Sequence, residues 1–181
     1  MINGKTVLAI IPARGGSKRA PRKNLREYRG KSLLLRAIDG ALCSQYIDQL
    51  LVSTEDKEIF SAALRCGVNV HARPHELATD TASSEDVLRH ALSLYPHDWV
   101  VLLQPTSPLR TAEDIDACIE RAQLGDGCVS YSNGTWQQNG AVYVATAEWI
   151  AKHDFSHQGL MKYTMPEERS LDIDTEEDFL K

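Results

Sequence analysis

Residues 7–24 read Val-Leu-Ala-Ile-Ile-Pro-Ala-Arg-Gly-Gly-Ser-Lys-Arg-Ala-Pro-Arg-Lys-Asn. The apolar run Val7–Ile11 predicts a buried strand, because a short aliphatic run fits a strand that is covered on both faces. The residues after Pro12 include two glycines, a serine and five cations, and they predict a loop that leaves the carboxyl end of this strand. Ligands of open α/β sheets bind at that edge.

Working outward, short apolar runs alternate with amphipathic stretches along the chain. This alternation predicts an α/β fold, a Rossmann-like three-layer sandwich with a mostly parallel sheet. The expected strands are Thr6–Pro12, Gln49–Ser53, Val68–Val70, Trp99–Leu103, Cys128–Tyr131 and Gly140–Ala145, and the expected helices are Leu33–Ser44, Glu55–Cys66, Glu85–Leu94 and Ala112–Gln123.

Local signals mark several helix ends. Ser53-x-x-Asp56 and Thr111-x-x-Asp114 each place a hydroxyl before an acid of the first turn, as in a capping box. Gly67 stands where a helix that ends at Cys66 needs a left-handed residue.

The bulk properties favour one globular domain. A length of 181 residues allows a proper core, and no apolar run approaches the roughly 20 residues that span a membrane. Four scattered cysteines without a C-x-x-C pair favour reduced thiols, and no secretory leader is visible, so we expect a cytoplasmic protein. The net charge of -5 argues against a general nucleic-acid binder.

The loop after Pro12 is cationic within an acidic chain. Between Arg14 and Lys31 there are eight Lys or Arg and one acid, whereas the whole chain has 20 Lys or Arg and 25 Asp or Glu. This local excess indicates a discrete anionic ligand. Gly15 and Gly16 allow close backbone approach, Ser17 offers a hydroxyl, and Arg14 and Lys23 can neutralise phosphate. The spacing is neither G-x-x-x-x-G-K-[ST] nor G-x-G-x-x-G.

A second candidate feature is Leu171-Asp172-Ile173-Asp174. In a strand, residues two apart share a face, so both carboxylates would project together. Like charges side by side are costly unless a cation lies between them, and hard carboxylate oxygens suit Mg²⁺. Thr175-x-x-Asp178 then predicts a capped helix start.

Two further polar residues follow the strand Trp99–Leu103. Gln104 ends this strand, where a ligand contact is expected, although a buried amide at a strand end is often only a turn residue. Arg110 precedes the helix start at Thr111, and a structural role is as well supported there as a functional one. The six histidines show no metal-ligand spacing.

Several strings of the chain resemble, in order, motifs of the acylneuraminate cytidylyltransferase (CMP-sialic acid synthetase) family. They are Ile11–Lys18 with Pro21–Asn24, Arg73-Pro74 with Glu76–Ala78, Asp80–Ser84, Leu103–Arg110, Asn139–Tyr143 and Met165–Asp178.

The resemblance implies an enzyme of the nucleotide-diphospho-sugar transferase type that activates a nonulosonic, sialic-acid-like sugar acid with CTP and Mg²⁺ and releases pyrophosphate. It implies Arg14, Lys23 and Gln104 as catalytic residues and Asp172 and Asp174 as metal ligands. The implied nucleotide-binding residues are Arg14, Gly15, Gly16, Ser17, Lys23, Asn24, Arg73, Ser83 and Ser84.

The chain departs from the family at Ser132–Gln138, where a longer dimerisation extension is usual. We therefore expect residues 1–181 to form a single nucleotidyltransferase domain that lacks most of this extension, and any homo-oligomer would need a non-standard interface. Three alternatives stay open: a catalytically weak nucleotide-binding protein that works with a partner, a cytidylyltransferase for another ulosonic acid such as Kdo, and an RNA-binding module. The negative net charge argues against the last of these.

Overall fold

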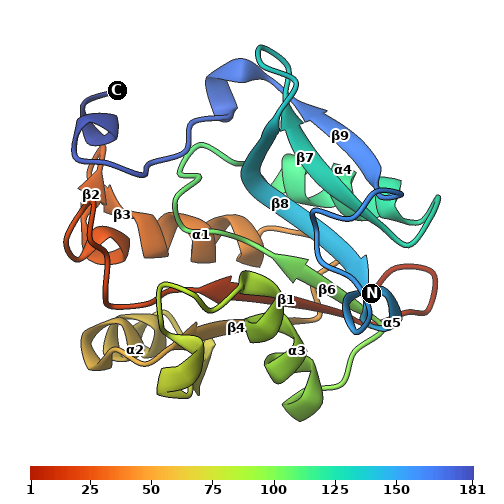
Figure 1. The fold of residues 1–181 in the computed structure, drawn as a ribbon, viewed down its shortest axis with the longest axis horizontal. Helices are drawn as coiled ribbons and strands as arrows, with labels where there is room; N and C mark the ends of the chain where they lie inside the picture. The colour runs from red at the N-terminus through yellow and green to blue at the C-terminus, as the bar shows by residue number, and fades with distance from the viewer.

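The computed structural model describes residues 1–181 and contains a seven-stranded sheet with helices on both faces (Figure 1). The strand order is β5-β4-β1-β6-β8-β7-β9. The first four strands in this order are parallel, β8 is antiparallel to both of its neighbours, and β7 pairs in parallel with β9. The mostly parallel Rossmann-like sandwich is confirmed. The strands are β1 (Val7–Pro12), β4 (Gln49–Thr54), β5 (Asn69–Ala72), β6 (Trp99–Leu102), β7 (Gly127–Ser132), β8 (Gln138–Thr146) and β9 (Met161–Met165).

Five α-helices form the two outer layers. Helices α1, α2 and α4 share one apolar cluster with the sheet, and α3 and α5 share another on the opposite face. The bounds are α1 (Leu33–Leu42), α2 (Lys57–Arg65), α3 (Ser84–Leu94), α4 (Ala112–Ala122) and α5 (Ala147–Ile150). Short 3₁₀ turns are η1 (Lys23–Leu25), η2 (His75–Leu77), η3 (Glu167–Arg169) and η4 (Glu177–Leu180), and β2 (Glu27–Tyr28) pairs with β3 (Lys31–Ser32).

The strand β1 lies at the centre of the core. Its side chains alternate between the two apolar clusters, with Val7, Ala9 and Ile11 on the side of α1 and Leu8 and Ile10 on the side of α3. All five are fully buried. Each large aliphatic side chain buried in this way contributes about 1.5–3 kcal/mol, so the apolar run holds the start of the cationic loop firmly in place.

The structure confirms some of the predicted helix ends and corrects others. Thr111 and Asp114 form a reciprocal capping box, and Gly67 has a left-handed φ of 73°. The prediction that Ser53 caps a helix is wrong: Ser53 remains in β4, and Asp56 caps α2 by accepting from two backbone N–H groups. An acid is itself a good N-cap, and the helix begins at Lys57, two residues later than predicted.

Segments far apart in sequence meet beside β2 and β3. The loop after β1 lies next to the segment that ends the chain (Figure 1). Ion pairs between Lys23 and Asp174 and between Arg26 and Glu176 join the two. No helix of the structure combines the length and apolar character needed to cross a membrane.

Candidate nucleotide site

A polar cavity of about 650 Å³ opens at the carboxyl ends of β1 and β6. Three loops and one carboxylate form its walls: the cationic loop after β1, the loop that leads into α3, the loop after β6, and Asp174. The lining residues are Pro12, Arg14, Gly16, Ser17, Lys18, Arg19, Lys23, Asn24, Arg73, Leu77, Thr79, Asp80, Ala82, Ser83, Ser84, Val87, Gln104, Pro105, Thr106 and Asp174. The structure therefore brings together nearly all of the predicted site residues.

Two carboxylates hold the cations of this cavity. Asp80 contacts the guanidinium of Arg14 at 2.7 Å and Nζ of Lys18 at 2.6 Å. Asp174 contacts Lys23 and Arg19, each at 3.1 Å. Lys18 and Asp80 lie inside the family motifs quoted above, and Arg19 lies in the cationic loop between two of them. Sequence reasoning did not single these residues out, since no spacing rule links an acid of one loop to cations of another loop about 60 residues away.

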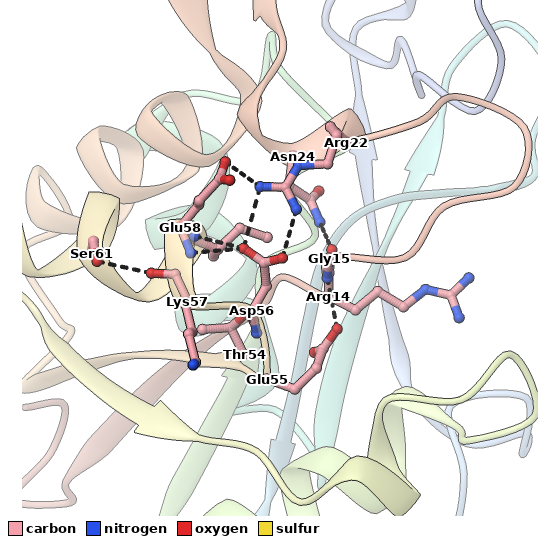
Figure 2. Close-up of polar contacts among 11 residues, drawn as sticks. Arg14, Gly15, Arg22, Asn24, Thr54, Glu55, Asp56, Lys57, Glu58 and Ser61 are labelled. Carbon is pink, nitrogen blue, oxygen red and sulfur yellow. Dashed lines mark hydrogen bonds and ion pairs between the residues drawn. The ribbon is translucent and has the colours of Figure 1, made fainter.

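The outer side of the cationic loop is fastened to α2, as Figure 2 shows. The guanidinium of Arg22 donates to the Asp56 carboxylate at 2.6 Å and to Glu58. Burial alone would raise the pKa of Asp56, but hydrogen bonds from the Ile59 N–H and from Arg22 outweigh it and hold that pKa below its ordinary value. Arg22 itself has a left-handed φ of 56°. This cation therefore anchors the loop and does not line the cavity.

The two glycines of the loop play different parts. The Gly15 N–H donates to Oε1 of Glu55 at 2.8 Å, and a Cβ on Gly15 would lie 2.4 Å from Oδ2 of Asp56. Gly15 is thus required by packing against Asp56, and it does not line the cavity; the nucleotide contact predicted for it stays a prediction. Gly16 lines the cavity with Ser17, and a Cβ on Gly16 would meet nothing within 4 Å.

Asn24 supports the loop from within. Its Nδ2 donates to the carbonyl of Arg14 at 2.9 Å, and the residue is 8% exposed. The guanidinium of Arg14 points away from the Arg22 cluster (Figure 2), toward Asp80. Asn24 therefore fixes the backbone from which Arg14 projects.

Arg73 lies on the cavity wall beneath the loop that leads to α3. Its guanidinium donates to the Ser53 carbonyl at 2.6 Å, to the Ser53 hydroxyl at 3.2 Å and to the Leu77 carbonyl at 3.2 Å. Burial lowers the pKa of Arg73, while the nearby Glu55 raises it. Ser83 caps α3 and Ser84 is its first residue, so both hydroxyl residues stand at the positive end of a helix dipole.

Gln104 faces the cavity, and Arg110 holds its backbone. Nη1 of Arg110 donates to the carbonyls of Gln104 at 3.0 Å and Ala141 at 2.7 Å. Burial lowers the pKa of Arg110 to about 10. Gly140 adopts a φ of +75°, and a Cβ there would lie 3.2 Å from Oε1 of Gln104 and 3.7 Å from Oδ2 of Asp172. The glycine of the Asn-Gly-Ala motif, Gly140, therefore leaves space beside Gln104 and Asp172, which are both predicted site residues.

The segment Leu171–Asp174 is not a strand, contrary to the prediction, because no neighbouring strand pairs with it. It is held instead by the Ile173 N–H, which donates to the Thr106 carbonyl at 2.8 Å, and by burial of the Ile173 side chain. The Asp174 N–H donates to the Asp178 carboxylate, so the turn at Asp178 orients the backbone of Asp174.

The two carboxylates of this segment line different hollows. Asp174 lines the main cavity, and Asp172 lines the groove next to it. Asp172 keeps contact with solvent, yet the surrounding protein desolvates it and raises its pKa; a hydrogen bond with Thr106 opposes this rise and the charge of Asp174 adds to it. No group of three or more His, Cys, Asp or Glu in the structure is arranged to hold a metal ion, so a cation here would have at most these two carboxylates as protein ligands.

The family model described as cytidylyltransferase matches residues 8–147, which include the cationic loop, Gln104 and the Asn-Gly-Ala motif. The chain belongs to the cytidylyltransferase family. Within the family it is 32% identical to an N-acylneuraminate cytidylyltransferase of Escherichia coli O18:K1:H7, over 96% of this chain but only 50% of the relative. It is also 32% identical to a CMP-N,N'-diacetyllegionaminic acid synthase of Legionella pneumophila, over 93% of this chain and 91% of the relative. A pseudaminic acid cytidylyltransferase of Campylobacter jejuni is 38% identical over 63% of this chain and 52% of the relative.

The cytidylyltransferase chain thus spans about half the length of the E. coli relative. That alignment runs over 211 residues although this chain has 181, so the relative has internal residues without a counterpart here. Solved structures support the fold. A CMP:2-keto-3-deoxy-manno-octonic acid synthetase in complex with CTP superimposes with a TM-score of 0.75 at 14% identity, over 94% of this chain and 93% of the other. A Mycobacterium tuberculosis protein in complex with manganese superimposes with a TM-score of 0.66 at 17% identity, over 97% of this chain and 96% of the other.

Proposed function

We propose that this protein transfers the cytidylyl group of CTP to a nonulosonic, sialic-acid-like sugar acid. The anomeric hydroxyl oxygen would form a bond to the α-phosphorus, the bond from that phosphorus to the bridging oxygen would break, and pyrophosphate would leave. The observation that carries the proposal is the polar cavity at the ends of parallel strands, where four cations of one loop face the carboxylates of Asp80 and Asp174. The named relatives make cytidine the favoured nucleotide and a nonulosonic acid the favoured acceptor.

The residues of the cavity suit a triphosphate. Arg14 and Lys23 would neutralise phosphate charge, and Gly16 and Ser17 would supply hydrogen-bond donors. Arg73 with Ser83 or Ser84 would hold the nucleoside end. Positioning and charge neutralisation are the main sources of rate in transfers at phosphorus, so this arrangement requires little covalent chemistry from the protein.

Asp172 and Asp174 fit a hard divalent cation, because both offer carboxylate oxygens. We propose Mg²⁺, which usually keeps several waters and takes phosphate oxygens as further ligands. When bound, such a cation would neutralise charge on the phosphates and lower the pKa of the attacking hydroxyl. The manganese complex of a structural neighbour supports the use of a divalent cation.

A second cavity of about 470 Å³ offers a place for the sugar acid. Tyr131 and Phe155 line it, and Nζ of Lys162 lies 4.9 Å from the Tyr131 ring without an acidic partner. The Phe155 N–H donates to Glu85 in the first turn of α3, which joins this cavity to the end of the nucleotide site. Lys162 would pair with the carboxylate of the sugar acid, and the aromatic rings of Tyr131 and Phe155 would pack against an apolar face of the sugar.

The connection between β7 and β8 favours a second candidate function. Its short turn leaves Trp136 69% exposed. A catalytically weak nucleotide-binding protein that acts with a partner would have such an exposed surface.

We propose that residues 1–181 form one domain that lacks most of the family's dimerisation extension. We also propose that this domain works in the cytoplasm, where its four free cysteines stay reduced.

The decisive experiment measures pyrophosphate release from CTP with Mg²⁺ and a panel of sugar acids that includes N-acylneuraminic, legionaminic, pseudaminic and Kdo-type acids. Turnover with one nonulosonic acid supports the proposal, and turnover with Kdo alone moves the acceptor to another ulosonic acid. Binding of CTP without turnover on the whole panel supports the second candidate. Preference for another nucleotide contradicts the cytidine assignment.

A further inference from the structure

Asp80 lies in the loop between η2 and α3 and reaches across the nucleotide cavity. Its two carboxylate oxygens contact Arg14 at 2.7 Å and Lys18 at 2.6 Å, and the aspartate itself lines the cavity. These two cations are its only side-chain partners. The side chain is 45% exposed, so burial does not require it to be paired.

The balance of charges in the cavity shows why the pairing of Asp80 with Arg14 and Lys18 is important. Its lining contains five cations and two carboxylates, and each carboxylate contacts two of the cations. Asp174 has a second proposed partner, the divalent cation. Asp80 has none, and its negative charge stands where the proposed triphosphate needs Arg14 free.

Local bonds present Asp80 to the cavity. The Thr79 hydroxyl lies 3.2 Å from the Thr81 hydroxyl and accepts from the Ala82 N–H at 3.2 Å. Arg73 fixes the carbonyl of Leu77 at one end of the loop, and the Ser83 cap of α3 fixes the other. The loop is thus fixed at both ends, with Asp80 near its middle. Arg14 and Lys18 are the only side chains that hold the Asp80 carboxylate.

We propose that Asp80 acts as an internal anion that a polyphosphate must displace from Arg14 and Lys18, and that it thereby sets the affinity of the site. The inference rests on the proposed function, since it assumes that the cavity takes a nucleoside triphosphate. Asp80 keeps the two cations in place while the cavity is empty and weakens the binding of any phosphate ligand that needs them. Exchange of one anion for another also favours ligands with several phosphates over a monophosphate.

The test uses the full chain and three probes, inorganic pyrophosphate, CTP and GTP, in titration calorimetry without a divalent cation. Asp80→Asn removes the charge and keeps the shape. Asp154→Asn is the matched control, because Asp154 pairs with Arg89 outside the cavity and is similarly exposed. We expect Asp80→Asn to bind pyrophosphate about 3- to 10-fold more tightly than the wild type, the effect of removing two exposed ion pairs. Asp154→Asn should stay within about twofold, and Asp80→Glu should restore weak binding.

Equal or weaker binding of pyrophosphate by Asp80→Asn overturns the inference, because it means that Asp80 holds the loop or contacts the ligand. The melting temperature of each variant shows that it is folded. The CTP probe tests the proposed function separately. If the wild type binds CTP no better than GTP, the cytidylyl assignment fails, while the pyrophosphate comparison still decides the role of Asp80.

Discussion

Nζ of Lys23 lies 3.1 Å from Oδ1 of Asp174, across 151 residues of sequence. The Lys23 side chain is only 13% exposed, so this contact is the most protected of the ion pairs that join the cationic loop to the segment after β9. The proposed phosphate cation and the proposed metal ligand therefore neutralise each other in the free protein. Binding of a metal–nucleotide complex would exchange their partners and leave both charges paired.

If the proposed function is correct, this exchange predicts that Asp174 is essential for catalysis. We expect Asp174→Ala to lower Mg²⁺-dependent pyrophosphate release from CTP by about 100-fold or more, because a metal ion contributes several kcal/mol of charge stabilisation. The readout is pyrophosphate release at saturating CTP. Asp126→Ala, at an exposed residue that does not line the cavity, should keep full activity. Full activity of Asp174→Ala would refute the metal assignment.

The anchor between Arg22 and α2 should act on substrate binding. Arg22→Ala frees the outer side of the loop from Asp56 and Glu58, and Lys23 and Asn24 follow directly in sequence. We expect KM for CTP to rise about 3- to 10-fold with a smaller change in kcat, since the lost pairs are partly exposed. Arg65→Ala, an exposed change of equal charge at the other end of α2, is the control. An unchanged KM would show that the loop holds its shape without this anchor.

The two loop glycines give a matched pair of substitutions. Gly15→Ala places a methyl group 2.4 Å from the Asp56 carboxylate, so we expect a loss of about 1–3 kcal/mol, or roughly 2–12 °C in Tm. Gly16→Ala meets no atom within 4 Å, so its Tm should stay close to that of the wild type. Thermal unfolding without ligands measures both. Equal Tm values for the two variants would contradict the packing role of Gly15.

Hydrophobic pattern was enough to predict the central sheet. Strands such as Trp99–Leu102 are buried on both faces and appear in the sequence as continuous apolar runs. Tertiary contacts do not easily override the strand preference of such a run. The strand Met161–Met165 was missed because only its Met165 end is fully buried and its burial alternates, so the sequence resembles a loop. The same limit explains Leu171–Asp174, where alternation reflects a single buried Ile173 and no strand partner.

The candidate site was predictable where one motif supplies both the residue and its setting, as for Ser17 or Gln104 beside the cavity. Long-range pairing was not predictable. Nothing in the sequence indicates that Asp80 reaches Arg14 or that Glu55 takes the Gly15 N–H, because each contact depends on how separate strands end at one edge of the sheet. Similarity to the relatives shows the family, whereas only the structure shows which charged side chains form ion pairs with one another.

Asp114 links α4 to the segment that carries the carboxylate pair. It is fully buried, and its carboxylate accepts from Arg169 at 2.8 and 3.0 Å, from the Tyr163 hydroxyl at 3.0 Å and from Thr111. Burial alone would raise the pKa of Asp114, but these donors outweigh it and hold the pKa below the ordinary value. A lowered folded-state pKa means that the stabilisation is complete above the unfolded-state pKa of about 4 and is lost as the pH falls through the folded-state value.

Asp114→Asn should therefore lower the free energy of unfolding at pH 7 by about 3 kcal/mol, the lower end for a broken buried pair because Arg169 is one-third exposed. This corresponds to roughly 6–12 °C in Tm. The difference from the wild type should shrink as the pH falls below about 4, since the unfolded wild type then takes up a proton on Asp114 more readily than the folded protein, whose Asp114 pKa is lower. Denaturant unfolding between pH 7 and pH 3 measures it, with Asp126→Asn as the exposed control. A difference that stays constant over this range would show that packing, and not the Asp114 charge, holds Arg169 and the segment after it.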